Sequence, residues 1–239
     1  MGIDGRSSNA KAQGAAAGAA LRGLGFNVDF APVADVPLNS KSFMYIAGRT
    51  FSFSPSTTSR LANAFAAGLE SNAISPTMKH FPGIGRTRYN TDAYEVTIEA
   101  SKTTLAPGLV PYQAAIAAGV PLIMLSNATY TAYDSANGAG WSHAISVDLL
   151  RTQLGFTGVS ITDSLYGTAK ARGIEAWRLA VLAAQAGTDM ILMTGSEAST
   201  QDAYANLMAW AADGAADGSV SRSRLVASYD RILALKSGL

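Results

Sequence analysis

A lysine and a histidine stand next to each other in this chain, between an apolar run and a loop rich in glycine and proline. Lys79 and His80 follow residues 73–78, which are small or apolar. Such a run predicts a buried strand that brings the pair to solvent at its end. Residues 81–85, Phe-Pro-Gly-Ile-Gly, then interrupt regular structure and let the backbone approach a ligand closely. A cation and an imidazole placed there suit a polar ligand, although an isolated pair of this kind is more often structural.

Two further charged residues stand where chemistry is expected. Asp163 ends the strand-like run Gly-Val-Ser-Ile-Thr at 158–162. A carboxylate there can be a nucleophile, a general base or a metal ligand, and it can equally cap the next helix. Ser164 and Gly167 favour a loop after it. Arg49 lies in a glycine-flanked loop, where a guanidinium can clamp hydroxyls or a carboxylate, or simply face water.

The composition is that of a compact enzyme rather than a disordered or nucleic-acid-binding chain. Residues 1–239 fit one sizeable domain, with 48% hydrophobic and 15% charged residues. The net charge is +1 and no stripe of Lys or Arg occurs, so nucleic acid and anionic membranes are not expected partners. The absence of cysteine excludes disulfides, thiolate metal sites and cysteine nucleophiles, but leaves the compartment open. No window predicts a membrane span or a signal peptide.

Helical and strand-like runs alternate along the chain. The expected strands are 28–33, 74–78, 121–125, 159–163 and 190–193. Five expected helices cover residues 10–24, 107–118, 174–186, 203–212 and 224–235. Two more are expected from their ends: one is capped by Ser54 and has Pro55 at its first position, and the other is capped by Ser146 and ended by Gly155. This order predicts an α/β fold built from parallel βαβ units, because each return to a parallel strand needs a crossover.

Polar residues gather just after the expected strands, at the edge that forms the active-site face of a (β/α) barrel. They are Asp35, Lys79, His80, Asn127, Asp163 and Thr194. Five strands are expected, so a closed eight-stranded barrel is not completed from these residues. No linker or change of composition indicates a second domain.

Four segments, in this order, resemble glycoside hydrolase family 3, and especially its single-domain β-N-acetylglucosaminidases. They are Asp-Phe-Ala-Pro-Val-Ala-Asp-Val at 29–36, Gly-Arg-Thr-Phe-Ser at 48–52, Lys-His-Phe-Pro-Gly at 79–83 and Gly-Phe-Thr-Gly-Val-Ser-Ile-Thr-Asp at 155–163. The likeness runs from about residue 10 to the C-terminus. It implies a TIM-type barrel that hydrolyses terminal β-linked sugars, such as N-acetylglucosamine of cell-wall fragments, with retention and without a metal or organic cofactor.

The resemblance also implies roles for individual residues. Asp163 matches the nucleophile, which forms a covalent glycosyl-enzyme intermediate. Arg49, Lys79 and His80 match positions that bind the hydroxyls of the sugar, and Asp35 is a weaker, structural match. A retaining glycosidase needs an ionised carboxylate below the anomeric carbon and a proton donor about 5 Å away on the other side. Charged donors to the hydroxyls orient the sugar ring, and hydrogen bonds that become stronger at the transition state lower the barrier.

The proton donor departs from the family pattern. In the family's acetylglucosaminidases, the loop after Lys-His-Phe-Pro-Gly carries an Asp-Ser-His element whose Asp and His act as the acid/base dyad. Here Asn90 stands at the expected Asp and Asp92 at the expected His. An amide offers no labile proton at useful pH. Asp92 is the candidate replacement if burial or the charge of Asp163 raises its pKa, and is otherwise a solvated loop carboxylate. His143 and Glu95 are poorer candidates, placed by their chemistry alone.

The start of the chain is the second departure. Family members begin with further barrel elements, including a strand with an acidic sugar-binding segment, and nothing before Ala10 resembles them. We therefore expect a barrel that lacks its first strands. Its open edge would expose apolar surface and favour self-association.

Three functions compete. The leading one is a retaining hydrolase of β-linked N-acetylglucosamine. The second is a noncatalytic or vestigial sugar-binding barrel, which Asn90 and the short start favour. The third is a barrel lyase or aldolase that uses Lys79 as a Schiff-base amine, against which the flanking His-Phe-Pro-Gly argues.

Overall fold

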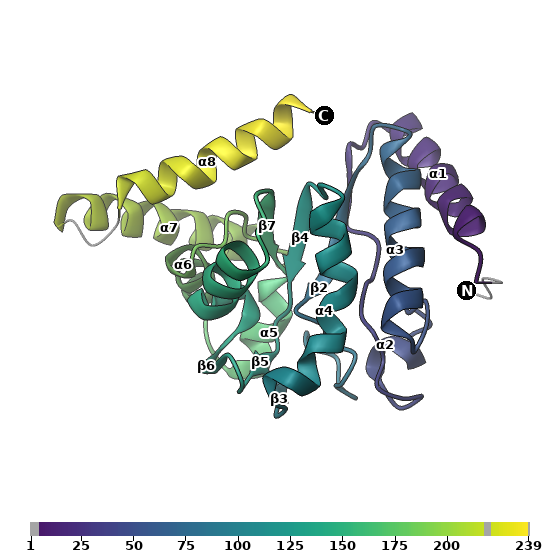
Figure 1. Ribbon diagram of the computed structural model, residues 1–239. Coiled ribbons are helices and arrows are strands. Elements are labelled where there is room, and N and C mark those ends of the chain that lie inside the picture. The colour runs from purple at the N-terminus through teal and green to yellow at the C-terminus, as the bar shows by residue number, and fades with distance from the viewer. Residues whose placement is uncertain (1–4, 218–220, 239) are drawn as a thin grey trace.

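A parallel sheet in the order β1-β2-β4-β7 forms the centre of the computed structural model, which describes residues 5–217 and 221–238 (Figure 1). Each neighbouring pair of strands is parallel. The strands are β1 (Val28–Asp29), β2 (Ser75–Phe81), β4 (Leu122–Leu125) and β7 (Val159–Thr162). Within the described chain a smaller sheet has the order β3-β5-β6, with β3 (Thr97–Ile98), β5 (Thr129–Tyr130) and β6 (Asp134–Gly138).

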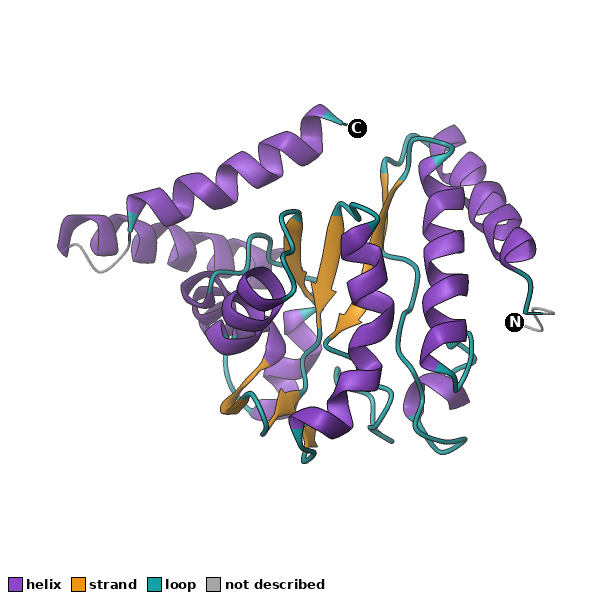
Figure 2. Cartoon of the chain, in the orientation of Figure 1, coloured by secondary structure: helices purple, strands orange, loops and turns teal. Residues whose placement is uncertain are grey.

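Helices separate the strands of the central sheet and pack around it (Figure 2). The helices up to β4 are α1 (Ser7–Gly23), α2 (Phe43–Ile46), α3 (Pro55–Glu70) and α4 (Lys102–Ala117). The later ones are the 3₁₀ turn η1 (Ala139–Trp141), the π-helix η2 (Ala144–Gln153), α5 (Leu165–Arg172), α6 (Ala176–Ala186), α7 (Glu197–Asp217) and α8 (Arg222–Ser237). In the described residues no helix is both long and apolar enough to cross a lipid bilayer.

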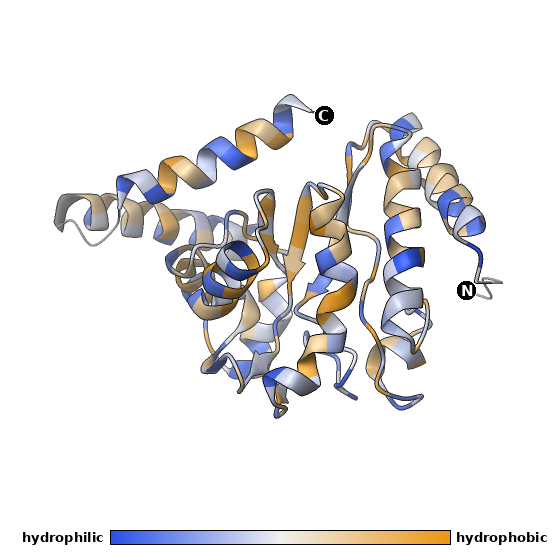
Figure 3. Ribbon diagram, in the orientation of Figure 1, coloured by the Kyte–Doolittle hydropathy of each residue, from blue (hydrophilic) through white to orange (hydrophobic). Residues whose placement is uncertain are grey.

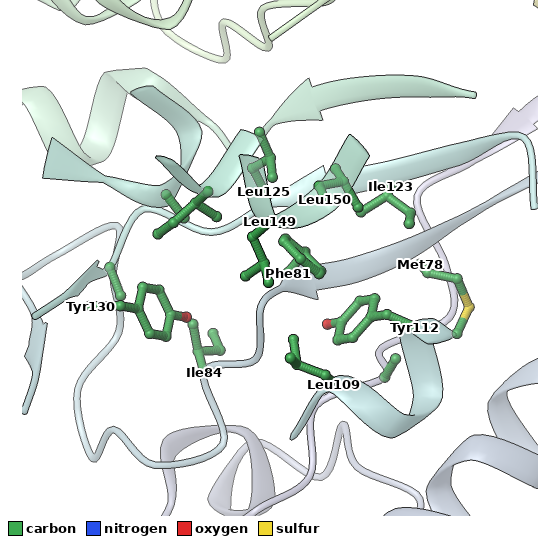
Figure 4. Close-up of a cluster of buried hydrophobic side chains, with 14 of the residues drawn as sticks. Met78, Phe81, Ile84, Leu109, Tyr112, Ile123, Leu125, Tyr130, Leu149 and Leu150 are labelled. Carbon is green, nitrogen blue, oxygen red and sulfur yellow. The ribbon is translucent and has the colours of Figure 1, made fainter. Parts of the chain in front are cut away.

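Close helix packing and a buried apolar core hold the sheet in place. Helix α1 lies directly against α3 because glycines face the contact: a Cβ at Gly14 would come within 2.1 Å of the Phe65 carbonyl oxygen. All four residues of β4 are buried, as expected for a strand covered on both faces. Figure 3 shows this as apolar colour along β4. In the buried cluster drawn in Figure 4, the rings of Phe81 and Tyr112 meet edge to face, with their centroids 5.2 Å apart.

The predicted alternation is confirmed, but two strands are much shorter than predicted. Residues 28–33 form only β1 and a bridge from Val33 to Lys79, because Pro32 has no N–H to give to a ladder. Residues 190–193 reduce to a bridge between Met190 and Ile161. Beyond it the Leu192 N–H is donated to the Thr162 hydroxyl instead of to a strand. The described parallel strands therefore form an open part of a barrel and not a closed one. Self-association at its edge stays a prediction.

Several predicted element ends are corrected. Strand β2 continues past Met78 to Phe81, so Lys79 and His80 lie within the strand and not after it. Helix α4 starts at Lys102 rather than Pro107, because the Ser101 hydroxyl caps it and two prolines are accommodated inside. In contrast, Ser54 caps α3 as predicted, with its hydroxyl accepting from the Thr57 N–H.

The prediction that Ser146 caps a helix is wrong. The π-helix already begins at Ala144, and the Ser146 hydroxyl instead donates to the Ala186 carbonyl 2.6 Å away. The loop predicted after Asp163 is also wrong, because α5 begins two residues later at Leu165. Gly187 ends α6 in the left-handed conformation, as its type suggests.

A buried carboxylate attaches the last helix to the sheet. Helix α8 lies across the end at which β4 and β7 begin (Figure 1). The side chain of Asp189 is fully buried and pairs with Arg151 and, at 2.7 Å, with Arg231 of α8. It also accepts hydrogen bonds from Ser228 and from the Ser160 N–H at the start of β7. Burial lowers the pKa of Arg151, and the charge of Asp189 opposes that shift.

We predict that Asp189→Ala lowers the free energy of unfolding by about 3–5 kcal/mol, because two cationic side chains would lose their buried partner. Chemical denaturation measures this. Asp230→Ala, at an exposed position of α8, is the matched control and should change stability by less than about 0.5 kcal/mol. Equal effects of the two substitutions would contradict the assignment.

Candidate active site

The end of β2 carries a histidine that is held from one side. The Nδ1 atom of His80 lies 2.7 Å from Oδ2 of Asp35, and the other carboxylate oxygen accepts the Ile84 N–H at 2.7 Å. Asp35 is fully buried, so these two donors compensate a charge that water cannot reach. The bond requires Nδ1 to carry a proton, and it leaves Nε2 free to face the site.

The free nitrogen of His80 points toward Asp163. Its Nε2 atom is 3.8 Å from Oδ2 of Asp163, so the imidazole lies between two carboxylates. Asp163 follows β7 directly, and its N–H is donated to the Leu125 carbonyl at the end of β4. Its Oδ1 atom accepts the Ser164 N–H at 2.8 Å, and 15% of its side chain remains exposed. The carboxylate is therefore oriented by backbone yet still accessible to a ligand.

The two predicted cations lie in the electrostatic field of this site. Lys79 is half-buried in β2, and burial followed by the charge of Arg49 lowers the pKa of its ammonium group. The carboxylates of Asp163, Asp29 and Asp35 act in the opposite direction. Arg49 is exposed on the loop after α2. The charge of Lys79 thus interacts with those of Arg49 and of three carboxylates, and the role of the two cations in binding a sugar stays a prediction.

The structure also brings Asp92 to the site. Its N–H is donated to Oδ1 of Asn90 at 3.0 Å, and its Oδ1 atom lies 3.4 Å from Nδ2 of Asn127. Asp92 is exposed as a residue, but partial desolvation of its carboxyl group raises its pKa, and the negative charge of Asp163 raises it further. The charges of His80 and Arg49 and the Asn127 hydrogen bond oppose this rise. Asn90 itself has a structural role in the turn.

The two weaker candidates are engaged elsewhere. His143 is 60% exposed and stands 3.6 Å from Asp148, also at the surface. Glu95 forms an ion pair with Arg172 at 2.6 Å. Neither interaction involves Asp163 or Asp92.

Sequence reasoning named Asn127 as a polar residue after a strand without giving it a role. Its side chain joins Asp92 to the residue that follows Asp163, by donating to the Ser164 carbonyl at 2.8 Å. A polar residue at the end of a buried strand was the only available signal. In the described part of the chain no group of three or more His, Asp or Glu side chains is placed to hold a metal ion.

Comparisons with known proteins agree on one family. The sequence pattern of the Glycosyl hydrolase family 3 N terminal domain matches residues 2–235. An uncharacterized secreted glycosyl hydrolase of Arthroderma benhamiae is 36% identical over 227 residues, which are 93% of this chain and 63% of that protein. A beta-hexosaminidase of Stenotrophomonas maltophilia is 33% identical over 180 residues, 74% of this chain and 52% of that protein. The chain thus spans between half and two thirds of the length of these relatives.

Solved structures show the same likeness. A glycoside hydrolase family 3 β-N-acetylglucosaminidase from Paenibacillus superposes with a TM-score of 0.90 at 30% identity, over 98% of this chain and 44% of that one. The β-N-acetylhexosaminidase of Beutenbergia cavernae gives 0.86 at 30% identity, over 97% and 69%. These neighbours are TIM-type barrels, so the open parallel sheet is part of that architecture.

We predict that His80 carries its proton on Nδ1 at mildly alkaline pH, because Asp35 accepts it there. The chain has two histidines, so nitrogen-15 spectra of the imidazoles are simple to assign. Exposed His143 is the internal control. Asp35→Asn should shift the His80 signals toward a mixture of tautomers and leave those of His143 in place. Unchanged His80 signals would contradict the bond.

We predict that Asp92→Asn stabilises the protein at neutral pH. The folded state raises the pKa of Asp92 above its ordinary value of 3.8, so folding binds this proton and stability is lost as the pH rises. The neutral amide avoids that loss. The gain in melting temperature should vanish below about pH 3.8 and grow toward neutrality, with Asp213→Asn on α7 as an exposed control. A gain that does not depend on pH would contradict the raised pKa.

Proposed function

Because the chain belongs to glycosyl hydrolase family 3, we propose that it is a retaining glycosidase that releases terminal β-linked N-acetylglucosamine. Asp163 is the nucleophile and Asp92 the acid/base in this proposal. The observation that carries it is that the two carboxyl groups have different surroundings. Asp163 lies between the imidazole of His80 and the Ser164 N–H, while Asp92 has a raised pKa. Environments that favour protonation of one carboxyl group over its neighbour are the requirement for such chemistry.

The reaction proceeds in two steps. An oxygen of Asp163 attacks the anomeric carbon, while Asp92 gives its proton to the departing glycosidic oxygen. This leaves a glycosyl ester on Asp163 and a carboxylate on Asp92. In the second step Asp92 takes a proton from water, the water oxygen attacks the anomeric carbon, and Asp163 leaves as a carboxylate. No metal or organic cofactor takes part.

Three side chains orient the sugar. Lys79 and Arg49 supply charged donors to hydroxyl groups, and such bonds are stronger than neutral ones. His80 presents Nε2 from a ring whose orientation is set by Asp35. Because the ring is held before the substrate arrives, little side-chain entropy is lost on binding.

The N-acetyl sugar is proposed from the relatives. The Stenotrophomonas protein is named a beta-hexosaminidase, and the Paenibacillus and Beutenbergia structures are described as a β-N-acetylglucosaminidase and a β-N-acetylhexosaminidase. All three are about 30% identical to this chain, and none of the three is matched over its full length.

A noncatalytic sugar-binding barrel is the second candidate. Asn90 favours it, because that residue stands where the family resemblance implies the acid and here only supports the turn before Asp92. The two candidates differ in whether a bound sugar is turned over.

We predict that the chain hydrolyses a chromogenic β-N-acetylglucosaminide faster than the matching β-glucoside. Asp163→Ala should lower kcat/KM by about 10⁴-fold or more, the scale expected for loss of a nucleophile. The exposed Asp148→Ala is the matched control and should retain activity. A 5-fluoro glycoside should trap a glycosyl ester that peptide mass spectrometry locates at Asp163.

Turnover that survives Asp163→Ala would exclude the nucleophile assignment. No turnover, together with a rise in melting temperature on adding N-acetylglucosamine, would favour the noncatalytic barrel.

A further inference from the structure

A single buried amide connects the two segments that carry the catalytic carboxylates. Asn127 follows β4, and only 1% of it is exposed. Its Nδ2 group is 2.8 Å from the Ser164 carbonyl oxygen and 3.4 Å from Oδ1 of Asp92. Since the Ser164 N–H is donated to Asp163, a chain of hydrogen bonds runs from one carboxylate through Ser164 and Asn127 to the other.

The backbone of α5 meets the same loop from the other side. A Cβ atom at Gly167 would lie 2.6 Å from the Asp92 carbonyl oxygen and 3.1 Å from the Asp92 Cβ. Only glycine allows this approach without movement of the loop. Helix α5 begins just after Asp163, so its position is tied to the nucleophile.

We propose that Asn127 and Gly167 form a clamp that positions Asp92, the acid/base, relative to the nucleophile. The inference rests on the proposed function and adds two positioning residues to it. Asn127 provides the hydrogen bond across the site, and Gly167 provides the space into which the Asp92 backbone settles. Neither residue needs to touch the substrate.

The orientation of the amide supports this role. Both hydrogen-bond partners of Nδ2 are acceptors, while the buried Oδ1 of Asn127 has no hydrogen-bond partner in the described structure. A flipped amide would set Oδ1 against the Ser164 carbonyl and the Asp92 carboxyl oxygen. The donor side is therefore directed at the loop, at the cost of an unsatisfied acceptor.

The clamp also has an electrostatic effect. An N–H directed at Asp92 stabilises its carboxylate, which is the form produced when the proton is transferred to the leaving group. The same hydrogen bond lowers the pKa of Asp92 against the effects of burial and of Asp163. Loss of the donor should therefore slow proton donation and raise the pKa of the acid.

The leaving group separates positioning from general structure. The leaving group of a dinitrophenyl glycoside departs with little protonation. For an unactivated aryl or alkyl glycoside, a general acid that protonates the leaving oxygen increases the rate by about 10²–10⁴-fold. We expect Asn127→Leu and Gly167→Ala to lower kcat/KM by about 10–100-fold on unactivated β-N-acetylglucosaminides and by less than about 3-fold on the dinitrophenyl compound. Asn127→Leu should also move the basic limb of the pH profile to higher pH.

The matched control for the glycine is Gly108→Ala in α4. It makes the same change within a helix, but its Cβ would meet its nearest neighbour, the Pro82 carbonyl oxygen, at an ordinary 3.5 Å. It should retain activity on both classes of substrate. Gly167→Ala keeps the Asn127 amide and Asn127→Leu keeps the glycine, so misfolding of one variant leaves the other as a test. Melting temperatures identify such a loss of fold.

Three results would overturn the clamp. One is an equal decrease of kcat/KM on activated and unactivated substrates for both folded variants, and another is no decrease on either substrate. In the third, Asp92→Ala shows the same loss on all leaving groups while Asp163→Ala abolishes turnover, which removes the acid assignment together with the clamp. If Asp92→Ala shows the leaving-group dependence and the clamp variants do not, only the clamp fails and the proposed function stands.

Discussion

The bond between Asp35 and His80 is the constraint on which the site depends. Asp35 follows Val33 and Ala34, which still pair with Lys79 of β2, and His80 lies near the end of β2. A fully buried carboxylate is stable only with donors around it, and here the donors are the imidazole of His80 and the Ile84 N–H. One interaction therefore anchors three segments: the stretch after β1, the end of β2 and the loop that leads toward Asp92. It also directs the remaining nitrogen of His80 at Asp163.

From that constraint follows the distribution of charge. Lys79 is adjacent to His80 in β2, the charge of Arg49 acts on Lys79, and the charges of Lys79 and Asp163 interact. Asp92, on its separate loop, is affected more by burial and by Asp163 than by these cations, and its pKa is raised. The two carboxyl groups therefore have different surroundings: Asp163 lies next to His80 and the Ser164 N–H, whereas the pKa of Asp92 is raised. On the proposed mechanism this difference decides which group is the nucleophile and which is the acid.

Sequence patterns indicated which residues gather in the candidate site, but not which contacts they make. Lys79, His80 and Asp163 were found because apolar runs precede them, and strand ends in α/β folds converge on one edge. The bond from His80 to Asp35 crosses 45 positions of sequence, and the bond from Asn127 to Asp92 crosses 35, so no local pattern reveals either. Local patterns also missed α5, because Ser164 and Gly167 resemble a turn, and the glycine is required by a tertiary contact. The short ladder at 28–33 could have been anticipated from Pro32.

On the proposed mechanism, the pairing of two aspartates also explains how one group serves as acid and then as base. Before the reaction, the negative charge of Asp163 helps to keep a proton on Asp92. When Asp163 becomes a glycosyl ester it loses that charge, so the repulsion that raised the pKa of Asp92 disappears. The effects of His80, Arg49 and Asn127, which all favour the carboxylate, remain. Asp92 therefore becomes more acidic at the step in which it must act as a carboxylate and accept a proton from water. A histidine in its place would respond in the same direction, and on this proposal the aspartate takes its role because desolvation and the charge of Asp163 raise its pKa.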